Sequence, residues 1–256
     1  MDPQGVDISA VLTLHSEGLL AHRTLKSITR TMRYAQERGL VVELVIVLDS
    51  SDEATEAYLR RSPFARSAAR ILSTRFSDSG PARNAGIQEA RGRFVAIFDG
   101  DDLWSENWLF RAHQLAHVNP RYVVHPEMQV TFGREGTGGI LYNYQMDQQL
   151  TQVRLSSLLF ANLWAIACVA PRQTFIDVPY APTSEQSGFG YEDWHWNCEL
   201  VAHGFVHKTA PRTALFYRSR QEGRCFQQVR ANCIVRHSRL FDDIVTLSHP
   251  RSGDAE

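Results

Sequence analysis

The sequence predicts an α/β protein in which a mostly parallel sheet is flanked by helices and followed by a smaller antiparallel region. Three observations carry this prediction. Short apolar runs alternate with amphipathic segments through the first half of the chain, as strand–helix–strand units do. The apolar runs are almost unbroken, which is typical of strands buried on both faces. Proline or glycine stands at the ends of several amphipathic segments, where helices begin and end.

Strands and helices are expected to alternate over the first 118 residues. The expected strands are Ile8–Leu14, Val41–Leu48, Ile71–Ser73 and Phe94–Phe98. The expected helices are a segment with Leu25, Ile28, Met32 and Ala35 on one face that ends at Gly39, then Asp52–Arg61, Pro81–Arg91, and a segment capped by Ser105 that runs to about Val118. Because a helix connects each strand to the next, the strands are expected to run parallel, so that their carboxyl ends meet at one edge of the sheet. Ligands of such sheets bind at that edge.

The second half of the chain is less regular. Its expected elements are antiparallel strands at Val130–Phe132 and Leu141–Tyr144 around Gly136–Gly139, a strand at Ala165–Ala170, a loop at Pro179–Gly190, a helix at Tyr191–His203 stopped by Gly204, and a long helix at Phe226–Leu247. The tail from Ser248 is expected to be disordered.

Composition excludes several classes of protein. With 256 residues, 43% of them hydrophobic, the chain is long enough for one domain with a full core and is not disordered as a whole. Its four cysteines form no CxxC pair, which argues against a disulfide scaffold and a structural zinc site. A net charge of −1 gives no basic field, so nucleic acid is not an expected partner.

The start of the chain and its hydropathy predict a location. The first ten residues lack the basic start and apolar run of a secretory signal. No apolar stretch reaches the roughly 18 residues needed to span a bilayer. We therefore expect a cytoplasmic protein, with peripheral contact at the inner face of the membrane as an alternative.

An acidic motif, Phe98-Asp99-Gly100-Asp101-Asp102, follows the fourth expected strand. Three carboxylates within four residues repel one another, which lowers stability unless a cation neutralises them. Mg²⁺ or Mn²⁺ prefers carboxylate and phosphate oxygens, so Asp99, Asp101 and Asp102 are candidate metal ligands. The alternative is a solvated acidic turn in front of the next helix.

A second motif spans Gly80–Gly86 and places Arg83 and Asn84 in the first turn of a helix. Free backbone N–H groups and the helix dipole favour an anion at that point, and a diphosphate fits there. A cation held by the acidic motif would bridge to the same diphosphate. The alternative is an ordinary surface arginine.

A third motif, Gly190–Trp196, places Glu192 and Asp193 in the first turn of another helix. Asp193 shares a helical face with Trp196 and Leu200, so its carboxylate is expected to point inward. An inward carboxylate beside indole rings has a raised proton affinity, which suits a general base. The alternative is that both acids complement the helix dipole.

The order of these motifs resembles that of the family-2-type nucleotide-sugar glycosyltransferases, which have the GT-A fold. The matching residues are the polar turn Leu14-His15-Ser16, Asp49 after the second strand, the Gly80–Gly86 helix start, Asp99–Asp102 and the Glu192-Asp193 pair. The similarity covers roughly residues 7 to 220. It implies a single GT-A domain over 1–256, divided into a nucleotide-sugar-binding half (7–118), an acceptor-side half (119–220), a C-terminal helix (221–247) and a tail (248–256).

The resemblance implies an inverting transfer of one sugar from a nucleotide diphosphate sugar, with a UDP-sugar favoured, to a hydroxyl of a glycan or lipid-linked glycan acceptor. Asp193 would be the catalytic base, and Asp101, Asp99 and Asp102 would hold Mn²⁺ or Mg²⁺. The donor would contact Leu14, His15, Asp49, Arg83, Asn84, Asp99, Gly100 and Asp101, and the acceptor would contact Glu192, Trp194 and Trp196. Bacterial surface polysaccharide or glycoconjugate synthesis is the expected setting.

The chain departs from the family's pattern at three places. Thr13-Leu14-His15-Ser16 stands where Pro-Thr-Tyr-Asn is common, Leu48 replaces the first of two aspartates, and Tyr217-Arg218-Ser219-Arg220 stands where an Arg-x-His stretch is often present. These departures leave open which nucleotide is bound and whether a later residue binds metal. The arginine-rich run Arg218–Arg239 can contact the donor diphosphate or the phosphates of a lipid-linked acceptor, or form a solvated helix face.

Two other functions fit the same fold. A sugar nucleotidyltransferase usually has a Gly-rich basic loop after its first strand, and residues Leu14–Ala21 hold one glycine and no lysine or arginine. A non-catalytic nucleotide-sugar-binding module has no need of the Glu192-Asp193 pair. The chain can also be one domain of a larger enzyme.

Overall fold

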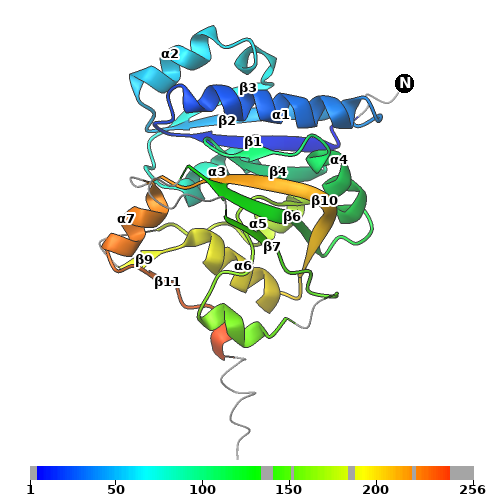
Figure 1. Ribbon diagram of the computed structural model, residues 1–256, viewed down its shortest axis with the longest axis vertical. Coiled ribbons are helices and arrows are strands. Elements are labelled where there is room, and N and C mark those ends of the chain that lie inside the picture. Colours follow the sequence, from blue (N-terminus) through cyan, green and yellow to red (C-terminus); the bar gives the residue numbers. More distant parts are fainter. Residues whose placement is uncertain (1–4, 134–140, 151–152, 184–187, 221–222, 243–256) are drawn as a thin grey trace, which may run out of the picture.

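The computed structural model describes residues 5–133, 141–150, 153–183, 188–220 and 223–242. Within these residues, nine strands form one sheet in the order β3-β2-β1-β4-β8-β6-β10-β5, with β7 paired to β6 (Figure 1). The glycine loop expected at 136–139 lies outside the described residues, as do part of the expected loop at 179–190 and the chain from 243 onward.

The first half of the chain folds as predicted, with four parallel strands joined by helices. In chain order its elements are β1 (Ile8–Leu14), α1 (Leu20–Gln36), β2 (Val42–Asp49), α2 (Glu53–Arg61), the 3-10 turn Ala65–Ser67, β3 (Arg70–Thr74), α3 (Ser79–Glu89), β4 (Phe94–Asp99), β5 (Leu103–Trp104) and α4 (Trp108–Ala116). β1 pairs in parallel with β2 and β4, and β2 pairs in parallel with β3. The apolar face predicted for α1 is confirmed, because Leu25, Ile28 and Ala35 are fully buried.

The second half contributes strands of both directions. Its elements are β6 (Tyr122–Phe132), β7 (Leu141–Tyr144), the 3-10 turn Leu155–Leu159, β8 (Val169–Pro171), α5 (Arg172–Asp177), β9 (Phe189–Gly190), α6 (Glu192–Ala202), β10 (Val206–Arg218), α7 (Arg224–Arg230) and β11 (Ile234–Val235). β8, shorter than expected, runs antiparallel to both β4 and β6 and joins the two halves in one sheet. β6 and β7 form the predicted antiparallel pair.

β10 is a strand that the sequence pattern does not predict. Pro211 and the charged residues around it interrupt the apolar pattern from which buried strands are predicted. The strand passes this point through a bulge, because its register against β6 shifts between Ala210 and Ala214 and Arg212 adopts a φ of 59°. β10 matters for function because its end carries Arg218 to the turn after β4.

Ser105 does not cap α4 as predicted. Its hydroxyl accepts a hydrogen bond from Ala214 N at 3.0 Å, and its own N–H donates to Ala214 O. Asn107 is the residue that precedes α4. Ser105 therefore joins the segment after β5 to the unpredicted strand β10, a contact between residues 109 positions apart that local spacing does not reveal.

The long helix predicted at Phe226–Leu247 is wrong. α7 ends at Arg230, and the chain then forms β11, which pairs in parallel with β9. Asn232 adopts a left-handed φ of 51°, and Cys233 N donates back to the last turn of α7 at 2.9 Å. Asparagine is one of the few residues that accept this conformation, so it turns the chain out of the helix.

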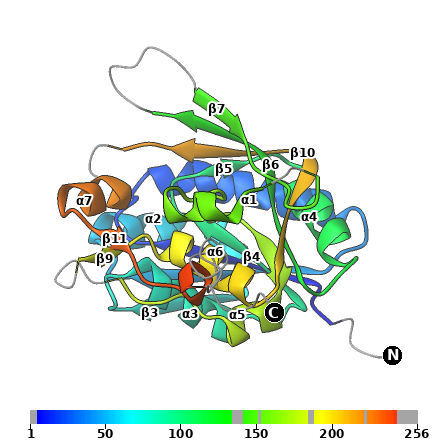
Figure 2. The same ribbon diagram turned by 90° about the horizontal axis from the view of Figure 1, so that it is seen from below.

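Helices cover both faces of the parallel part of the sheet (Figure 2). α1 and α4 pack on one face through a core that includes Leu25 and Leu109. α3, α5 and α6 pack on the other face through Ile87, Phe175 and Trp196. No helix in the described part of the chain is long and apolar enough to cross a membrane.

Gly86 allows α3 to lie directly on the sheet. A Cβ atom there would come within 2.5 Å of Val11 Cγ1 and 2.8 Å of Val47 Cγ2. Both valines are fully buried, so neither has room to move aside. We expect Gly86→Val to lower the free energy of unfolding by about 3 kcal/mol, measured by urea denaturation. Gly5→Val is the matched control, since nothing lies within 4 Å of a Cβ there, and equal stability of the two variants would contradict this role.

Candidate active site

Five segments meet at the carboxyl edge of the sheet, beside α7 (Figure 1). They are the turns after β1 and β4, the first turns of α3 and α6, and the residues at the end of β10. All three sequence motifs are among them. Hydrogen bonds and ion pairs join the side chains of these segments, so the motifs form one site.

Arg83 joins two of the motifs. Its Nη1 donates to Glu192 Oε1 at 2.7 Å, and its Nη2 donates to Asp99 Oδ1 at 2.8 Å. Arg83 is only 4% exposed, so the alternative of an ordinary surface arginine is wrong. A buried guanidinium needs carboxylate partners such as these two, and the donor contact predicted for Arg83 stays a prediction.

The start of α3 is already capped by an acid. Asp78, which is buried, accepts a hydrogen bond from Gly80 N at 3.2 Å, and Arg224 Nη2 lies 3.2 Å from the same carboxylate oxygen. A carboxylate therefore takes the position at the helix N-terminus that favours negative charge. The diphosphate site predicted at this point stays a prediction, with Asp78 as the group that caps the helix.

Asn84 binds the protein backbone. Its amide nitrogen donates to Tyr180 O at 2.8 Å, and its amide oxygen accepts from Tyr180 N at 3.1 Å. Both ends of the side chain are used to fix the segment after α5 against α3. The nucleotide contact predicted for Asn84 stays a prediction.

Glu192 is the anionic partner that holds Arg83. It is buried and also accepts a hydrogen bond from the Ser79 hydroxyl. Burial alone would raise the pKa of Glu192, but the charges of Arg83 and Arg224 and the Ser79 bond hold it at about 2. Glu192 is thus ionised, and the hydrogen bonds from Arg83 and Ser79 are both made to Oε1; the acceptor contact predicted for Glu192 stays a prediction.

Asp193, the predicted base, has a different environment. Its Oδ2 accepts a hydrogen bond from Asn162 Nδ2 at 2.9 Å, and its Oδ1 accepts from Trp194 N at 2.9 Å. Burial and the neighbouring charge of Glu192 raise the pKa of Asp193 to about 7. The pKa values of these two adjacent acids therefore differ widely, and Asp193 is the one that can exchange a proton near neutral pH. Asn162 has no motif around it, and no sequence signal points to its role.

The acidic turn holds its carboxylates in unequal environments. Asp102 is 2% exposed and accepts a hydrogen bond from Arg218 N at 2.8 Å. Burial, with the charges of Asp101 and Asp99, holds the pKa of Asp102 well above its ordinary value. Asp102 thus ties the turn to β10, and its predicted role as a metal ligand stays a prediction. The alternative of a solvated acidic turn is wrong for this side chain, because it is buried.

Arg220 is the cation beside the acidic turn. Its Nε lies 2.7 Å from Asp101 Oδ2, and its Nη2 lies 3.8 Å from Glu17 Oε1. Glu17 accepts a hydrogen bond from His15 N and so closes the turn after β1. Burial raises the pKa values of both Glu17 and Asp101, and the charge of Arg220 counters that shift. The sequence indicated Arg220 through its basic run, and Glu17 through its place among the polar residues at the end of the first strand.

Gly100 lets the acidic turn pack on the end of β1. A Cβ there would come within 2.6 Å of Leu14 Cδ2 and 2.8 Å of Glu17 Cδ. The side chain of Leu14 is fully buried and supports this turn. The donor contacts predicted for Gly100 and for the backbone at Leu14 stay predictions.

Asp49 organises the loop after β3. It is 5% exposed, and its carboxylate accepts hydrogen bonds from the Thr74 hydroxyl at 2.9 Å, Phe76 N at 2.7 Å and Asp78 N at 3.0 Å. The carboxylate thus holds the loop in place, and its predicted contact with the base or ribose stays a prediction. Its carbonyl oxygen lies 2.6 Å from His15 Nδ1, and the donor contact of His15 stays a prediction.

Two carboxylates suit a divalent cation that is also bound by substrate phosphates. Within the described residues, no group of three or more His, Cys, Asp or Glu side chains is placed to hold a metal ion. Asp99 uses one oxygen for Arg83 and keeps a quarter of its side chain exposed, and its charge raises the pKa of Asp101. Such mutual repulsion fits a cation, and Mg²⁺ commonly takes only one or two carboxylates plus phosphates.

Comparison with known proteins identifies the family. The model for glycosyl transferase family 2 matches residues 9–170, well over half of the chain. The chain belongs to glycosyl transferase family 2. This glycosyltransferase is also 36% identical over 104 residues to the succinoglycan biosynthesis protein ExoO of Rhizobium meliloti (strain 1021). That match covers 40% of this chain and 28% of the relative, so the chain spans only part of that protein's length.

Solved structures of low sequence identity share the fold. GalNAc-T7 with UDP, GalNAc and Mn²⁺ gives a TM-score of 0.59 at 18% identity, over 87% of this chain and 45% of that one. S. aureus TarS gives 0.60 at 14% identity, over 97% and 44%. TarS 1-349 in complex with UDP gives 0.55 at 13% identity, over 96% and 73%. The predicted GT-A fold is therefore confirmed for this glycosyltransferase.

The two tryptophans expected at the acceptor differ in this glycosyltransferase. Trp196 is 1% exposed, donates from Nε1 to Val178 O at 2.7 Å, and stacks on Phe175 and Tyr180. It is a core residue, and its predicted acceptor contact is wrong. Trp194 is only partly buried, and its acceptor contact stays a prediction.

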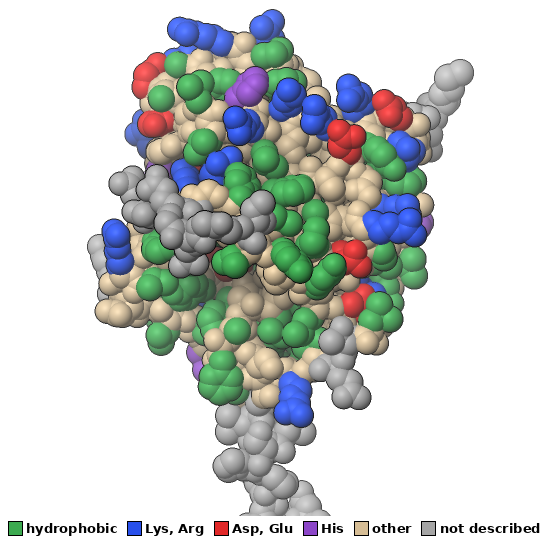
Figure 3. All heavy atoms as spheres, in the orientation of Figure 1, with side chains coloured by type: hydrophobic (Ala, Val, Ile, Leu, Met, Phe, Trp, Pro, Cys, Tyr) green, Lys and Arg blue, Asp and Glu red, His purple; other side chains and the backbone are tan. Residues whose placement is uncertain are grey.

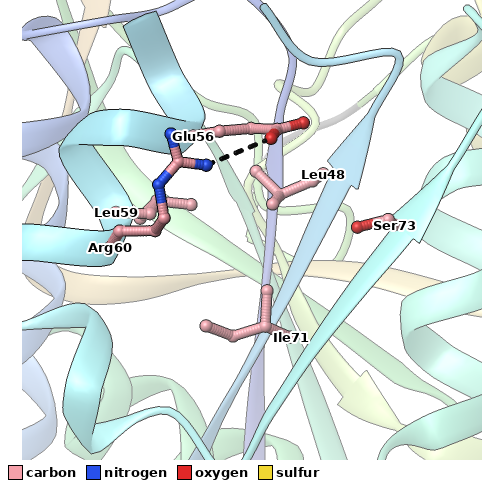
Figure 4. A pocket seen from close by; sticks show the side chains of 6 residues that line it. All are labelled: Leu48, Glu56, Leu59, Arg60, Ile71 and Ser73. Atoms are coloured by element: carbon pink, nitrogen blue, oxygen red, sulfur yellow. Dashed lines mark hydrogen bonds and ion pairs between the residues drawn. The ribbon is translucent and has the colours of Figure 1, made fainter. Parts of the chain in front are cut away.

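A separate pocket of about 160 Å³ lies between α2 and the edge formed by β2 and β3 (Figure 4). It is lined by Leu48, Glu56, Leu59, Arg60, Ile71 and Ser73. Three of these side chains are apolar, and the ion pair between Arg60 and Glu56 borders them. The pocket shares no lining residue with the acidic turn or with α6, so it is not part of the candidate active site.

The acceptor-side half of the glycosyltransferase exposes apolar side chains on β7. Leu141, Tyr142 and Tyr144 are each more than half exposed. Figure 3 shows hydrophobic side chains on this face of the molecule. Because β7 pairs only with β6, this surface lies across the sheet from β3 and the turns beside it.

Proposed function

We propose that this glycosyltransferase moves a sugar from a nucleoside diphosphate sugar, with a UDP-sugar preferred, to a hydroxyl of a glycan or lipid-linked glycan. The bridge from Asp99 through Arg83 to Glu192 supports this most, because it fixes the acidic turn and Asp193 in one site. The succinoglycan relative and the neighbours solved with UDP support the same class of reaction. Bacterial surface polysaccharide or glycoconjugate synthesis is the proposed setting.

The proposed reaction is a direct displacement that inverts the anomeric centre. The acceptor oxygen attacks the anomeric carbon, the bond to the diphosphate oxygen breaks, and Asp193 takes the acceptor's proton. Negative charge develops on the leaving diphosphate. Arg220 provides positive charge at the acidic turn, where preorganised charge lowers the barrier.

Asp99 and Asp101 would hold Mn²⁺ or Mg²⁺ when the donor is bound. The ion supplies neutralising charge for the leaving diphosphate. We expect dialysis against EDTA to lower turnover by about a hundredfold or more and to weaken UDP binding measured by calorimetry. Adding Mn²⁺ should restore both in the wild type but not in Asp101→Asn. Full turnover and unchanged UDP affinity after EDTA would contradict the metal role.

Turnover is expected to follow the ionisation of Asp193. A base must be deprotonated, and the pKa of Asp193 is about 7, so kcat/KM should fall about tenfold per pH unit below pH 7 and level off above it. The change in rate comes from the base, so UDP affinity should vary much less over the same range. A kcat/KM profile that stays flat between pH 5.5 and 8 would contradict this assignment.

A panel of donors tests the function itself. The protein is incubated with UDP-, GDP- and TDP-sugars, with and without Mn²⁺, and released nucleoside diphosphate is measured by chromatography. Release from one donor supports the proposal. Pyrophosphate formation from a sugar phosphate and a nucleoside triphosphate would indicate a nucleotidyltransferase instead, and binding without release would indicate a binding module. Sedimentation with anionic liposomes at several salt concentrations tests the membrane contact that a lipid-linked acceptor would require.

A further inference from the structure

Asp193, the proposed base, receives a hydrogen bond on each carboxylate oxygen. Trp194 N donates to Oδ1 at 2.9 Å, and Asn162 Nδ2 donates to Oδ2 at 2.9 Å. The first donor is a backbone group in the first turn of α6. The second is a side-chain amide, which can turn over and exchange its N–H₂ group for its oxygen. An oxygen turned toward Asp193 would repel the ionised carboxylate, so the orientation of the Asn162 amide decides how the base is held.

Asn197 fixes that orientation. It lies on α6, four residues after Asp193, and is 1% exposed. Its Nδ2 donates to Asn162 Oδ1 at 2.9 Å and to the backbone oxygen of Trp164 at 3.1 Å. A backbone carbonyl can only accept, so it determines which end of the Asn197 amide turns toward it. Asn162 Oδ1 then points to Asn197, and Asn162 Nδ2 is left to point to Asp193.

The Trp164 carbonyl, from which this direction follows, belongs to a well-anchored residue. Trp164 is 1% exposed, donates from Nε1 to Met146 O at 2.7 Å, and stacks on His207 with ring centroids 3.8 Å apart. The nitrogen of the same peptide group, Ala165 N, donates to Gln145 Oε1 at 2.7 Å. Both ends of this peptide group are therefore hydrogen-bonded, and its carbonyl keeps one direction.

Turning either amide over would place like atoms against each other. With Asn197 reversed, its oxygen would face the Trp164 oxygen. With Asn162 reversed, its N–H₂ group would face that of Asn197 and its oxygen would face Asp193. Neither arrangement leaves a hydrogen bond at these contacts, and unpaired polar groups at buried positions are unfavourable. The folded protein therefore selects one direction for the whole series of hydrogen bonds.

We propose that Asn197 is a positioning residue, which aims the amide of Asn162 at Asp193 and so holds the base in one orientation. The inference rests on the proposed function, because Asp193 is a base only if the chain transfers a sugar to a hydroxyl. A hydrogen bond donated to a carboxylate favours its ionised form, which is the form that accepts a proton. Asn197 thus acts on the base through Asn162 and without touching substrate.

Charged and titratable groups act on Asp193 from the elements packed around it. In the described part of the chain they include Glu192 on the same helix, Arg83 on α3, Asp99 at the end of β4, Tyr180 after α5 and Cys225 on α7. Asn197 is neutral, so replacing it by another neutral residue leaves all of these groups in place. A change in the ionisation of Asp193 would therefore report the hydrogen bond from Asn162.

Asn197→Leu, a substitution of similar size, tests the proposal on the carboxylate itself. Carbon-13 NMR of the aspartate carboxyl groups measures the ionisation midpoint of Asp193 without any substrate, and the signal is assigned by its loss in Asp193→Asn. The midpoint should rise by about one pH unit, as expected when an ionised group loses a hydrogen bond. With the donor, kcat/KM should fall about tenfold at pH 6 and by less at pH 9. A variant that merely loses folded protein would show the same loss at both pH values.

The double variant Asn162→Ala with Asn197→Leu shows whether Asn197 acts through Asn162. Asn162→Ala should raise the midpoint by itself, and adding Asn197→Leu should move it no further, because the donor is already gone. Cys198→Ala is the matched control, since Cys198 is the next residue on α6 and is fully buried. It should lower the melting temperature and leave the midpoint of Asp193 unchanged.

An unchanged midpoint in Asn197→Leu would overturn the positioning role and leave the proposed function intact. Additive shifts in the double variant, or an equal shift in Cys198→Ala, would overturn it as well. If the midpoint rises as expected but no donor is ever turned over, the positioning role stands and the proposed function fails. If Asn197→Leu does not fold, Asn197→Ala, which adds no bulk, decides the same question by the same measurements.

Discussion

Replacing Asp193 by asparagine is expected to lower kcat by about 10²- to 10⁴-fold, the usual contribution of a general base. The amide keeps the size of the side chain but cannot accept the acceptor's proton. Donor affinity should change little, because Asp193 is not among the residues proposed to hold the donor. Steady-state kinetics with the donor found in the panel, together with UDP calorimetry, measures both quantities.

Asp177→Asn is the matched control for this prediction, since Asp177 is an exposed acid at the end of α5. It should retain full activity. Asn162→Ala tests the positioning of the base: losing a donor to the carboxylate should move the midpoint of the kcat/KM profile above pH 7. Wild-type kcat in Asp193→Asn would remove Asp193 from the mechanism.

Arg83→Met is expected to be the most destabilising of the proposed substitutions. It leaves the carboxylates of Asp99 and Glu192 without their shared partner, and breaking a buried pair in this way costs about 3–5 kcal/mol. For a chain of this size the melting temperature should fall by about 10 °C or more. Transfer activity should be lost as well, because Arg83 holds the acidic turn and α6 together. Calorimetric melting and the transfer assay check the two effects.

The control for Arg83→Met is Arg60→Met, which removes an arginine whose ion pairs with Glu53 and Glu56 are exposed. Exposed pairs contribute about 1 kcal/mol or less, so this variant should melt close to wild type. Adding Glu192→Gln to Arg83→Met should recover part of the lost stability, because it removes one unpaired charge. Equal melting temperatures for the Arg83 and Arg60 variants would show that the bridge is not a buried charge network.

The parallel half of the fold is predictable because its signals are local. The apolar run of β2 and the spacing of Leu25, Ile28 and Ala35 on α1 require only neighbouring residues to be interpreted. β10 is not predictable in this way, since Pro211 interrupts its pattern and its pairing with β6 depends on distant residues. The false C-terminal helix had a local signal against it in Asn232, but the apolar spacing on either side outweighed it.

The sequence predicts the motifs of the site, but it does not predict which of their polar atoms form hydrogen bonds within the protein. Arg83, Asn84 and Asp102 look like ligand-binding residues by type and position. The structure commits each of them to a partner between 96 and 116 residues away in the chain. Such distant partners cannot be predicted from the spacing of residues in the sequence. The raised pKa of Asp193 was predictable because its helical face and its acidic neighbour are both local.

A crystal structure with UDP and Mn²⁺ tests most directly whether one site unites the acidic turn with Asp193. We predict that the diphosphate lies at Asp99 and Asp101 within reach of Arg220. The oxygen of the terminal phosphate that carries the sugar in the donor should face Asp193. A nucleotide bound in the pocket between α2 and β3, or one whose diphosphate points away from Asp193, would contradict it.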